Sequence, residues 1–392
     1  MGCTSLNKAI QAYDWTYVGE GNQNLVVRYT GSDESFVGKV LRVLKSNCKN
    51  QHVDKQTLLS KKDFVDRIIR PLLGEEYVLS LQPISTSEIF LHQLATIIQP
   101  ARPLARLGTE IITNAPISFI MADLTQMWPN SPTLTFELKP KWGFKPSSTA
   151  VHKIKTQYCR YCMHSHFRKT KLNGYCPLDL YSDTSSLLCN AVDILLKKAP
   201  LEKTLRVFIN GKFTSLNNAD PDTEYKSVLQ IDSQDELLPR ILEAILIQDP
   251  ILRKLKTLQA DFDELDVEKI MPLYQQLGNI DTDNDLFAKV VDKYKKQQQG
   301  SNAPKTDLQR MLEYVLSMTF KDCSLMINVI PKRNKTLNHK FIALRNGLIF
   351  YYDIKVIDTD LKKVDKIPYW YELDQIIVKH AIETCFTKER AC

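Results

Sequence analysis

The octet from Glu137 to Phe144 carries the most unusual combination of charged side chains in the sequence, Glu-Leu-Lys-Pro-Lys-Trp-Gly-Phe. In an extended segment the side chains of Glu137, Lys139 and Lys141 point to one face, because successive residues alternate between the two faces. Two ammonium groups on one face suit a ligand with several phosphate groups, since each can donate a charge-assisted hydrogen bond. An exposed edge strand that lysine protects from pairing is the alternative interpretation of the same octet.

Two aspartates lie at the ends of predicted strands. Asp322 directly precedes the apolar run 323–330, and Asp358 directly follows the predicted strand 348–357. One carboxylate could accept the proton of a hydroxyl group while the other holds magnesium, a division of labour that is typical of phosphoryl transfer. Aspartates also commonly end strands and begin turns, so either residue alone is compatible with a structural role.

A glycine turn, Gly19-Glu20-Gly21-Asn22-Gln23-Asn24, lies between two strand candidates. The backbone N–H groups of such a turn can bind an anion, and glycine lets the backbone come close to phosphate groups. The turn lacks the third glycine of G-x-G-x-x-G and is no Walker loop, so an ordinary hairpin turn is the alternative. Together, the turn, the lysines and the carboxylates are consistent with a phosphoryl transferase.

Two clusters resemble metal sites only in part. Cys159 and Cys162, with Cys176 further on, lack a second cysteine or histidine pair at the spacing of a zinc site. The acidic run 281–285 lacks the glycine and the final glutamate of an EF-hand calcium loop. We therefore expect no zinc, buried cysteines in a helix, and a helix that begins at the acidic run.

The elements that must position these residues follow from the spacing of apolar residues. Strands are predicted within 15–28, 36–43, 111–125, 134–138, 205–216, 323–330 and 341–357. Helices are predicted within 237–265 and 308–316, and residues 53–82 are predicted to be helical or mixed. Asn-Gly pairs at 210–211 and 346–347 predict hairpins, because both central positions of a type I′ turn need positive φ. Residues 293–305 predict an exposed loop, Thr306 with Gln309 predicts a helix start, and the whole order indicates an α+β fold.

The amino-acid composition excludes several classes of protein. The chain has 392 residues, 43% hydrophobic and 25% charged, which excludes collagen, a disordered tail and a coiled-coil rod. Its 52 Lys and Arg exceed its 45 Asp and Glu, and the net charge of +7 is compatible with a polyanionic ligand. We expect no membrane span and no signal peptide, so the nine cysteines should be reduced thiols in the cytosol or nucleus.

Six segments in this order resemble the inositol-pentakisphosphate 2-kinase family, and most of all its fungal members. The segments are Gly19–Val26, Glu137–Phe144, Arg160–His164, Tyr175–Leu180, Asp322–Ile327 and Ile357–Lys362. The resemblance extends from residue 13 to about residue 371. Members of this family transfer the γ-phosphate of ATP to the axial 2-hydroxyl of inositol 1,3,4,5,6-pentakisphosphate and produce inositol hexakisphosphate, or phytate.

The resemblance implies a two-lobed fold that is distantly protein-kinase-like, with a helical insertion in the C-terminal lobe. The N-terminal lobe would span residues 1–120, the hinge 121–126, the C-terminal lobe 127–392 and the insertion about 233–320. Plant members carry a structural zinc site in the insertion. Residues 190–321 contain neither Cys nor His, so apolar packing of helices near 237–275 would have to replace that site.

The resemblance also implies the roles of individual residues. Asp322 would orient and deprotonate the 2-hydroxyl, and Asp358 would bind magnesium. The residues that contact ATP would be Gly19, Glu20, Gly21, Asn22, Asn24, Arg42, Met121, Asp123, Arg206 and Asp358. The residues that contact the inositol phosphate would be Arg106, Lys139, Lys141, Arg168, Lys362, Lys366 and Trp370.

Some of these assignments have alternatives or depart from the family. Lys39 is the alternative to Arg42, and Arg102 is the alternative to Arg106. The residues that differ from the usual family residue are Ala122, Arg168, Lys366 and Trp370. Arg and Lys bind phosphate differently, because only the guanidinium offers a planar pair of donors.

The implied cofactors are ATP and magnesium, and the implied partner is inositol pentakisphosphate. We expect a monomer that needs neither nucleic acid nor a membrane, in the nucleus or cytoplasm, with the resemblance favouring the nucleus. A non-catalytic basic scaffold that binds nucleic acid or acidic lipid headgroups is the alternative, although the basic residues are scattered and no nucleic-acid motif is present. A catalytically dead kinase-like adaptor is a third interpretation, against which the presence of both Asp322 and Asp358 argues.

Overall fold

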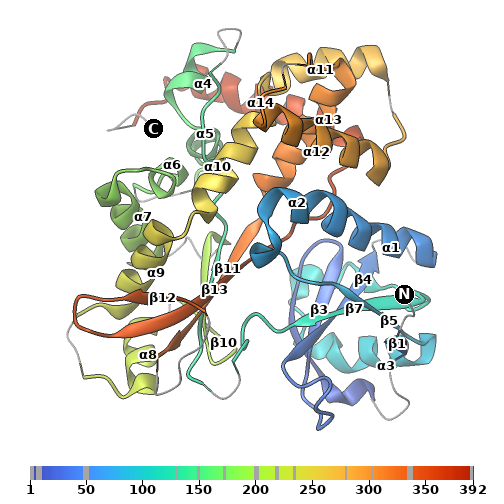
Figure 1. The fold of residues 1–392 in the computed structure, drawn as a ribbon, viewed down its shortest axis with the longest axis vertical. Coiled ribbons are helices and arrows are strands. Elements are labelled where there is room, and N and C mark those ends of the chain that lie inside the picture. The colour runs from blue at the N-terminus through green and yellow to red at the C-terminus, as the bar shows by residue number, and fades with distance from the viewer. Residues whose placement is uncertain are drawn as a thin grey trace. The chain divides into compact units, whose positions relative to one another are not determined.

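The structure is a computed structural model in which the chain divides into two compact units (Figure 1). It describes residues 4–5, 11–46, 53–128, 131–147, 151–170, 174–197, 203–216, 220–232, 235–278, 280–301, 303–332, 339–388 and 392. The first unit contains Met1–Asp63 and Leu79–Asn130, and the second contains Phe64–Val78 and Ser131–Cys392. Within the described ranges, no helix is both long and apolar enough to cross a lipid bilayer.

The first unit is built on a mixed sheet in which, among the described residues, seven strands take part. They are β1 (Thr4–Ser5), β2 (Trp15–Glu20), β3 (Asn24–Tyr29), β4 (Lys39–Ser46), β5 (Gln82–Ser85), β6 (Glu110–Ile111) and β7 (Ile117–Ala122). Their order is β1-β5-β7-β4-β3-β2, and β6 pairs with β4. Only the β1–β5 pairing is parallel among these strands.

Alternating apolar residues explain why this sheet forms. In β3 the side chains of Leu25, Val27 and Tyr29 are buried, while the residues between them are partly exposed. Helix α3 (Glu88–Ile98) begins at Ser87, whose hydroxyl accepts a hydrogen bond from the Phe90 N–H at 3.2 Å. One apolar stripe of α3 is buried, and α3 packs against β2.

The other helical segments of the first unit are short. They are α1 (Lys55–Phe64), whose last residue belongs to the second unit, and the 3₁₀ turns Ala12–Asp14, Gln99–Ala101 and Leu104–Arg106. The prediction of helical or mixed structure for residues 53–82 is confirmed: the segment is helical up to Leu73, and the chain enters strand β5 at Gln82.

The second unit is built on an antiparallel sheet of six strands within the described part of the chain. They are β8 (Leu134–Leu138), β9 (Leu205–Ile209), β10 (Lys212–Thr214), β11 (Ser324–Pro331), β12 (Lys340–Ala343) and β13 (Ile349–Ile357), in the order β10-β9-β8-β11-β13-β12. Strand β11 lies in the middle, and its residues Ser324–Ile330 are all buried. A continuous apolar strand of this kind is typical of a sheet that is covered on both faces.

Helices make up most of the rest of the second unit (Figure 1). They are α2 (Arg70–Leu73), α4 (Lys153–Gln157), α5 (Arg160–Phe167), α6 (Pro177–Leu180), α7 (Ser185–Lys197), α8 (Pro221–Leu229), α9 (Leu237–Gln248), α10 (Ile251–Asp261), α11 (Asp266–Leu277), α12 (Asn284–Gln298), α13 (Asp307–Phe320) and α14 (Ile367–Glu383). Short segments are the π-helical Val65–Ile69 and the 3₁₀ turns Glu75–Tyr77 and Val364–Lys366. Helix α13 packs against α10 and α11, and α14 packs against α5 and α11.

The α+β class is confirmed, and several local predictions can be compared with the structure. Strand β8 has the predicted bounds 134–138. Thr306 caps α13 and accepts a hydrogen bond from the Gln309 N–H at 3.2 Å, as predicted. The predicted loop 293–305 is wrong in its first half, because α12 continues to Gln298 on an apolar stripe that includes Val290 and Val291.

The two Asn-Gly hairpins differ in their turns. Asn210 and Gly211 both have positive φ, 48° and 78°, which fits the predicted type I′ turn. At the second hairpin only Gly347 has positive φ, 85°, so the predicted turn type is wrong although the hairpin exists. The Leu344 N–H bonds to the Leu348 carbonyl at 2.8 Å, and this bond closes a turn that leaves Asn346 at negative φ.

Candidate active site

Three strand ends meet at one end of the second sheet. Leu138 at the end of β8 pairs with Leu325 of β11, and Ile357 at the end of β13 pairs with Ser324 of β11. The segments that follow β8 and β13 and that precede β11 therefore begin side by side. These segments carry Lys139, Asp358 and Asp322.

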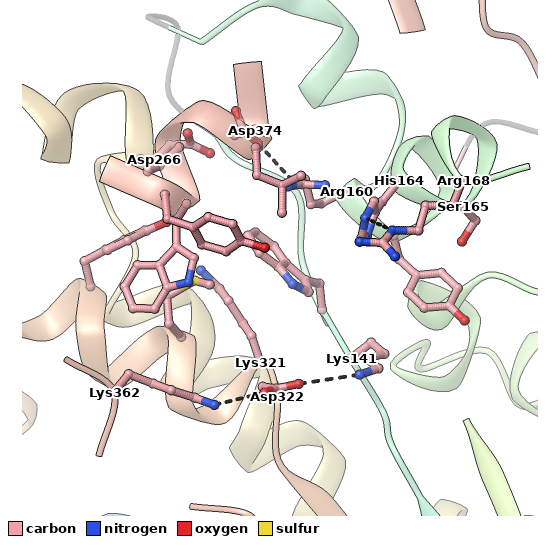
Figure 2. A pocket seen from close by; sticks show the side chains of 18 of the residues that line it. Lys141, Arg160, His164, Ser165, Arg168, Asp266, Lys321, Asp322, Lys362 and Asp374 are labelled. Carbon is pink, nitrogen blue, oxygen red and sulfur yellow. Dashed lines mark hydrogen bonds and ion pairs between the residues drawn. The ribbon is translucent and has the colours of Figure 1, made fainter. Parts of the chain in front are cut away.

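The two predicted aspartates each contact predicted lysines. Lys139 Nζ lies 3.2 Å from Asp358 Oδ2, and Lys141 Nζ lies 3.6 Å from Asp322 Oδ1. Lys362 Nζ lies 2.9 Å from Asp322 Oδ2 (Figure 2). The lysine box and the strand-end carboxylates, which lie far apart in the sequence, thus form one charged cluster.

The charges in this cluster shift the pKa values of its members. Burial alone would raise the pKa of Asp322, but the charge and hydrogen bond of Lys362, with Lys141 and Lys139, outweigh burial and lower it. Burial lowers the pKa of Lys141, and the neighbouring Lys139 lowers it further against the opposing effect of Asp322. Asp322 is therefore an ionised acceptor at neutral pH, and its side chain is 57% exposed.

A buried amide holds the lysine box in place. Gln259 Oε1 accepts a hydrogen bond from the Gly143 N–H at 2.7 Å, and Gln259 Nε2 donates to the Lys141 carbonyl at 2.9 Å. The same Nε2 is 3.0 Å from the Phe320 carbonyl, and the Tyr181 hydroxyl donates to the Lys141 carbonyl at 3.1 Å. A Cβ at position 143 would lie 2.9 Å from the Tyr181 ring, so only glycine fits there.

Two of the charged residues have an unusual backbone. Lys141 and Asp358 both have φ of 61°, in the left-handed region that non-glycine residues seldom occupy. Such conformations persist where the surrounding structure imposes them, and they gather at functional sites. Here Lys141 pairs with Asp322 and Asp358 pairs with Lys139 in the cluster.

A cavity of about 610 Å³ in the second unit adjoins the cluster. Five predicted residues line it: Lys141, Arg168, Asp322, Lys362 and Trp370. Four further basic residues line it for which the sequence analysis assigned no role: Arg160, His164, Lys203 and Lys321. Figure 2 labels most of these residues, among them Arg160, His164 and Arg168 of the α5 region, Lys321 and Asp322 after α13, and Lys141 and Lys362.

Helix α5 presents a row of basic side chains to the cavity. Arg160, His164 and Arg168 are spaced four residues apart, so they share one face of the helix. Arg168 Nε donates to His164 Nε2 at 2.9 Å, and Arg160 Nε donates to Asp374 Oδ1 at 2.9 Å. Burial, with the charges of Arg160, Arg168 and Lys141, lowers the pKa of His164 to about 4, so this imidazole is neutral at pH 7. The four-residue spacing is the signal that could have found this row.

Lys321 precedes the catalytic candidate and is buried. It forms an ion pair with Asp263, and its Nζ lies 4.1 Å from the centre of the Trp142 ring. Burial lowers the pKa of Lys321 against the opposing effect of Asp263. The pair fixes the end of α13 and with it the position of Asp322, which follows directly in the chain.

In the first unit, the glycine turn joins β2 to β3 as predicted, and Glu20 is part of its framework. The Glu20 carboxylate accepts hydrogen bonds from Arg102 Nε at 2.9 Å and Nη2 at 2.8 Å, and it forms an ion pair with Lys45. Arg106 is half-buried, and its Nη1 donates to Asn22 Oδ1 at 2.8 Å. Arg102 is thus occupied by a buried ion pair, which favours Arg106 for a ligand contact.

Asp123 of the predicted hinge is buried and bonded within the first unit. Its carboxylate binds Arg28 and accepts hydrogen bonds from the Thr125 N–H at 2.9 Å and the Thr125 hydroxyl at 2.7 Å. Its own N–H donates to the Gly38 carbonyl at 2.9 Å. These contacts fix the segment that follows Met121, and the adenine contact of both residues stays a prediction.

The remaining predicted residues lie outside the cavity. Lys39 and Arg42 are both on β4, and because they are three residues apart they point to opposite faces of the sheet. Arg206 on β9 pairs with Glu137 on β8 at 3.4 Å. Lys366 is exposed at the start of α14 and does not line the cavity.

Comparison with known proteins identifies the family of this chain. The sequence model of the family described as inositol-pentakisphosphate 2-kinase matches residues 17–376. An inositol-pentakisphosphate 2-kinase of Danio rerio is 25% identical over 462 residues, covering 95% of this chain and 93% of the relative. Relatives of the same name are 27% identical in Cryptococcus neoformans (95% and 94% covered) and 26% identical in Arabidopsis thaliana (94% and 93% covered). The match spans nearly all of the chain, and the chain belongs to the inositol-pentakisphosphate 2-kinase family.

Proposed function

We propose that this protein transfers the γ-phosphate of ATP to the axial 2-hydroxyl of inositol 1,3,4,5,6-pentakisphosphate and so produces inositol hexakisphosphate. The observation that carries this proposal is the ionised carboxylate of Asp322, held by Lys141 and Lys362 on the wall of a cavity with many basic side chains. A scaffold that only binds polyanions would use the basic side chains, but a carboxylate among them would repel its ligand. A kinase, in contrast, needs a group beside its substrate that accepts the proton of the hydroxyl.

Asp322 acts as the residue that orients the 2-hydroxyl and takes its proton. Its low pKa keeps it ionised, so it can accept a hydrogen bond from the hydroxyl before the new oxygen–phosphorus bond forms. Lys141 and Lys362 hold one carboxylate oxygen each and fix the direction of the side chain. The strength of this base is low, so positioning rather than proton affinity supplies most of its effect.

The basic side chains of the cavity bind the phosphate groups of the inositide. A pentakisphosphate is so highly charged that removing it from water requires several fixed cations, each with a charge-assisted hydrogen bond. Lys141, Lys362 and Arg168 are the predicted basic ligands that line the cavity, and Arg160 and Lys203 extend the basic set. Their arrangement around the ring selects the isomer, because a misplaced phosphate would leave a buried cation unpaired.

Asp358 is suited to hold magnesium. Magnesium prefers carboxylate oxygens, and the Asp358 side chain is 53% exposed at the end of β13. The Ser324 hydroxyl donates to Asp358 Oδ2 at 3.0 Å and orients the carboxylate, while Lys139 balances its charge. The bound ion would neutralise charge on the ATP phosphates during transfer.

We assign ATP binding to the glycine turn, Arg42, Met121, Asp123, Arg206 and Asp358, and we assign Arg106 to the inositide. The proposal includes the two-lobed, protein-kinase-like arrangement, with a hinge at 121–126 and a helical insertion at about 233–320. The assignment of ATP binding to the glycine turn is supported by the tightness of the turn. The Gly21 N–H bonds back to the Asn24 carbonyl at 2.9 Å and closes it. A monomeric state and a nuclear or cytoplasmic location stay predictions.

The test is incubation of the purified protein with ATP, magnesium and each pentakisphosphate isomer, followed by anion-exchange separation of the products. We expect hexakisphosphate from the isomer with a free 2-hydroxyl, and no product from the others. Asp322→Asn is the matched control, because it keeps the shape of the side chain and removes the proton acceptor. Tight inositide binding with no turnover in the wild-type protein would support the scaffold alternative.

A further inference from the structure

A buried ammonium group behind the cavity contacts three carboxylates. Lys155 Nζ, in α4, lies 2.6 Å from Asp266 Oδ1 and 2.8 Å from Asp374 Oδ2. It also lies 3.2 Å from Glu268 Oε1. An ammonium group has three N–H donors, so these three contacts satisfy it. The Lys155 side chain is only 3% exposed, which leaves water little part in holding it.

The charge of Lys155 holds these carboxylates together. One oxygen of each lies within 4.8 Å of the others, so without a cation the three groups would repel one another. Burial alone would lower the pKa of Lys155, but Asp374 and Asp266 outweigh burial and raise it. Lys155 is therefore charged, and its ammonium supplies the cation that the three carboxylates need.

These contacts join three helices of the second unit. Asp266 and Glu268 belong to the first turn of α11, Asp374 belongs to α14, and Lys155 belongs to α4. Asp266 has φ of 61°, a conformation that persists in a non-glycine residue where the surrounding contacts impose it. Lys155 is therefore the common contact of α4, α11 and α14.

One of the three carboxylates also orients a cavity residue. Asp374 accepts from Lys155 on Oδ2 and from Arg160 Nε on Oδ1, the latter at 2.9 Å (Figure 2). Arg160 and Asp374 line the cavity, whereas Lys155 does not. Within the described part of the chain, the Arg160 side chain bonds through Nε alone, so its two Nη groups remain available for phosphate.

The backbone of Arg160 is held by contacts other than those of Lys155. Arg160 is the first residue of α5, and the sulfur of its N-cap, Cys159, accepts a hydrogen bond from the Cys162 N–H at 3.4 Å. Four cysteine sulfurs lie within 4.8 Å of one another at this end of the helix, those of Cys159, Cys162, Cys176 and Cys392. Lys155 therefore acts on the direction of the Arg160 side chain rather than on the place of its backbone.

We propose that Lys155 is a positioning residue for the inositide: it holds Asp374 so that the Nη groups of Arg160 point into the cavity and bind a phosphate group of the substrate. This inference rests on the proposed function, because it assigns Arg160 to the inositide. Lys155 itself touches no substrate, so its replacement removes a constraint and no ligand. A guanidinium binds phosphate through a planar pair of donors, so a change in its direction weakens the contact.

The first experiment compares Lys155→Met with Lys305→Met. Lys305 is a matched control, because it also pairs with two carboxylates, Glu313 at 2.9 Å and Glu264 at 3.5 Å, and does not line the cavity. Both variants should unfold at a lower temperature, since each leaves carboxylates with one cation fewer. Only Lys155→Met should raise the inositide KM, at least about tenfold, with kcat and the KM for ATP changed less than about twofold. An unchanged inositide KM in Lys155→Met, or an equal rise in both variants, would overturn the proposal.

A charge-balanced variant separates side-chain direction from net charge, and it keeps the test available if Lys155→Met does not fold. Lys155→Met/Glu268→Gln removes one positive and one negative group, and Glu268 does not line the cavity. The inositide KM should still rise at least about tenfold in this pair, and it should stay within about twofold of the wild-type value in Glu268→Gln alone. A wild-type KM in the pair would show that net charge alone matters, against the proposal.

A double-mutant cycle tests whether Lys155 acts through Arg160. Arg160→Met should raise the inositide KM at least about tenfold in the wild-type background, but less than about twofold in the charge-balanced pair, where the guanidinium has already lost its direction. Equal increases in the two backgrounds would show that Lys155 acts independently of Arg160 and would contradict the proposal. A purely structural role of Lys155 predicts such equal increases.

Calorimetry with inositol pentakisphosphate in the absence of ATP separates this proposal from the proposed function. Wild-type protein that binds the inositide without turnover would contradict the proposed function, and the same variants would then test the positioning role through the dissociation constant. Wild-type turnover with the same inositide KM in Lys155→Met would contradict the positioning role and leave the proposed function standing.

Discussion

Replacing Gln259 by leucine tests how the lysine box is positioned. Gln259 is fully buried, and its side-chain amide bonds to the Gly143 N–H and to the carbonyls of Lys141 and Phe320. Leucine fills a similar volume but offers no hydrogen bond. The Lys141 carbonyl keeps the Tyr181 hydroxyl as a partner and the Phe320 carbonyl keeps the Cys323 thiol, whereas the Gly143 N–H loses the amide oxygen that it bonds.

The size of the effect follows from the unpaired Gly143 N–H. A buried backbone group that loses its hydrogen bond costs about 1–3 kcal/mol, so Gln259→Leu should lower the free energy of unfolding by about that amount. Displacement of the Lys141 ammonium should also weaken one charge-assisted contact, worth about 1.5–3 kcal/mol, and raise the inositide KM roughly tenfold to hundredfold.

The assay compares urea unfolding and steady-state kinetics of wild-type protein, Gln259→Leu and the control Gln309→Leu. Gln309 is also buried, and its side chain bonds to Glu313 at 2.9 Å rather than to the lysine box. Both variants should unfold at lower urea concentration, but only Gln259→Leu should raise the inositide KM. An unchanged urea midpoint for Gln259→Leu, or an equal rise of KM in both variants, would refute the reasoning.

Three other predictions concern single charges. Asp322→Asn should reduce kcat roughly a hundredfold to ten-thousandfold with little change in ATP affinity by calorimetry, and near-normal turnover would remove Asp322 from the catalytic role. Arg102→Ala should lower the melting temperature because it leaves Glu20 with one partner fewer, whereas Arg106→Ala should leave the melting temperature unchanged and raise the inositide KM. The pKa of His164 is about 4 in the folded protein against an ordinary 6.5, so its contribution to stability is complete above pH 6.5 and is lost as the pH falls toward 4. The urea midpoint of unfolding of His164→Gln should therefore vary less between these pH values than that of the wild-type protein. Parallel plots of midpoint against pH for the two proteins would contradict this.

Local sequence patterns predicted the elements that hold the site. Strand β8 was predictable because Leu134, Phe136 and Leu138 are apolar at alternate positions, and their side chains are fully buried. The aspartates at 322 and 358 could be placed at strand ends for the same reason. That these ends lie together depends on strand order in the sheet, which apolar spacing does not encode.

Other parts of the site depend on contacts between distant segments. Nothing near Cys162 in the sequence indicates Cys392, because the two meet only after α14 has packed against α5. Glu20 belongs to a turn that suggests phosphate binding, yet its carboxylate holds Arg102 and Lys45 within the first unit. The choice between ligand contact and framework contact is made by tertiary packing, which the type of residue does not reveal.

The basic side chains of the strand-end cluster already have carboxylate neighbours. Lys141 and Lys362 share Asp322, Lys139 faces Asp358, and Arg160 faces Asp374 in the same region. A polyanion that binds there replaces a carboxylate as the partner of each basic side chain. Few anions from the solution are therefore released when it binds. The affinity for the inositide should therefore decline less steeply with added potassium chloride than the number of cations around the ring would suggest.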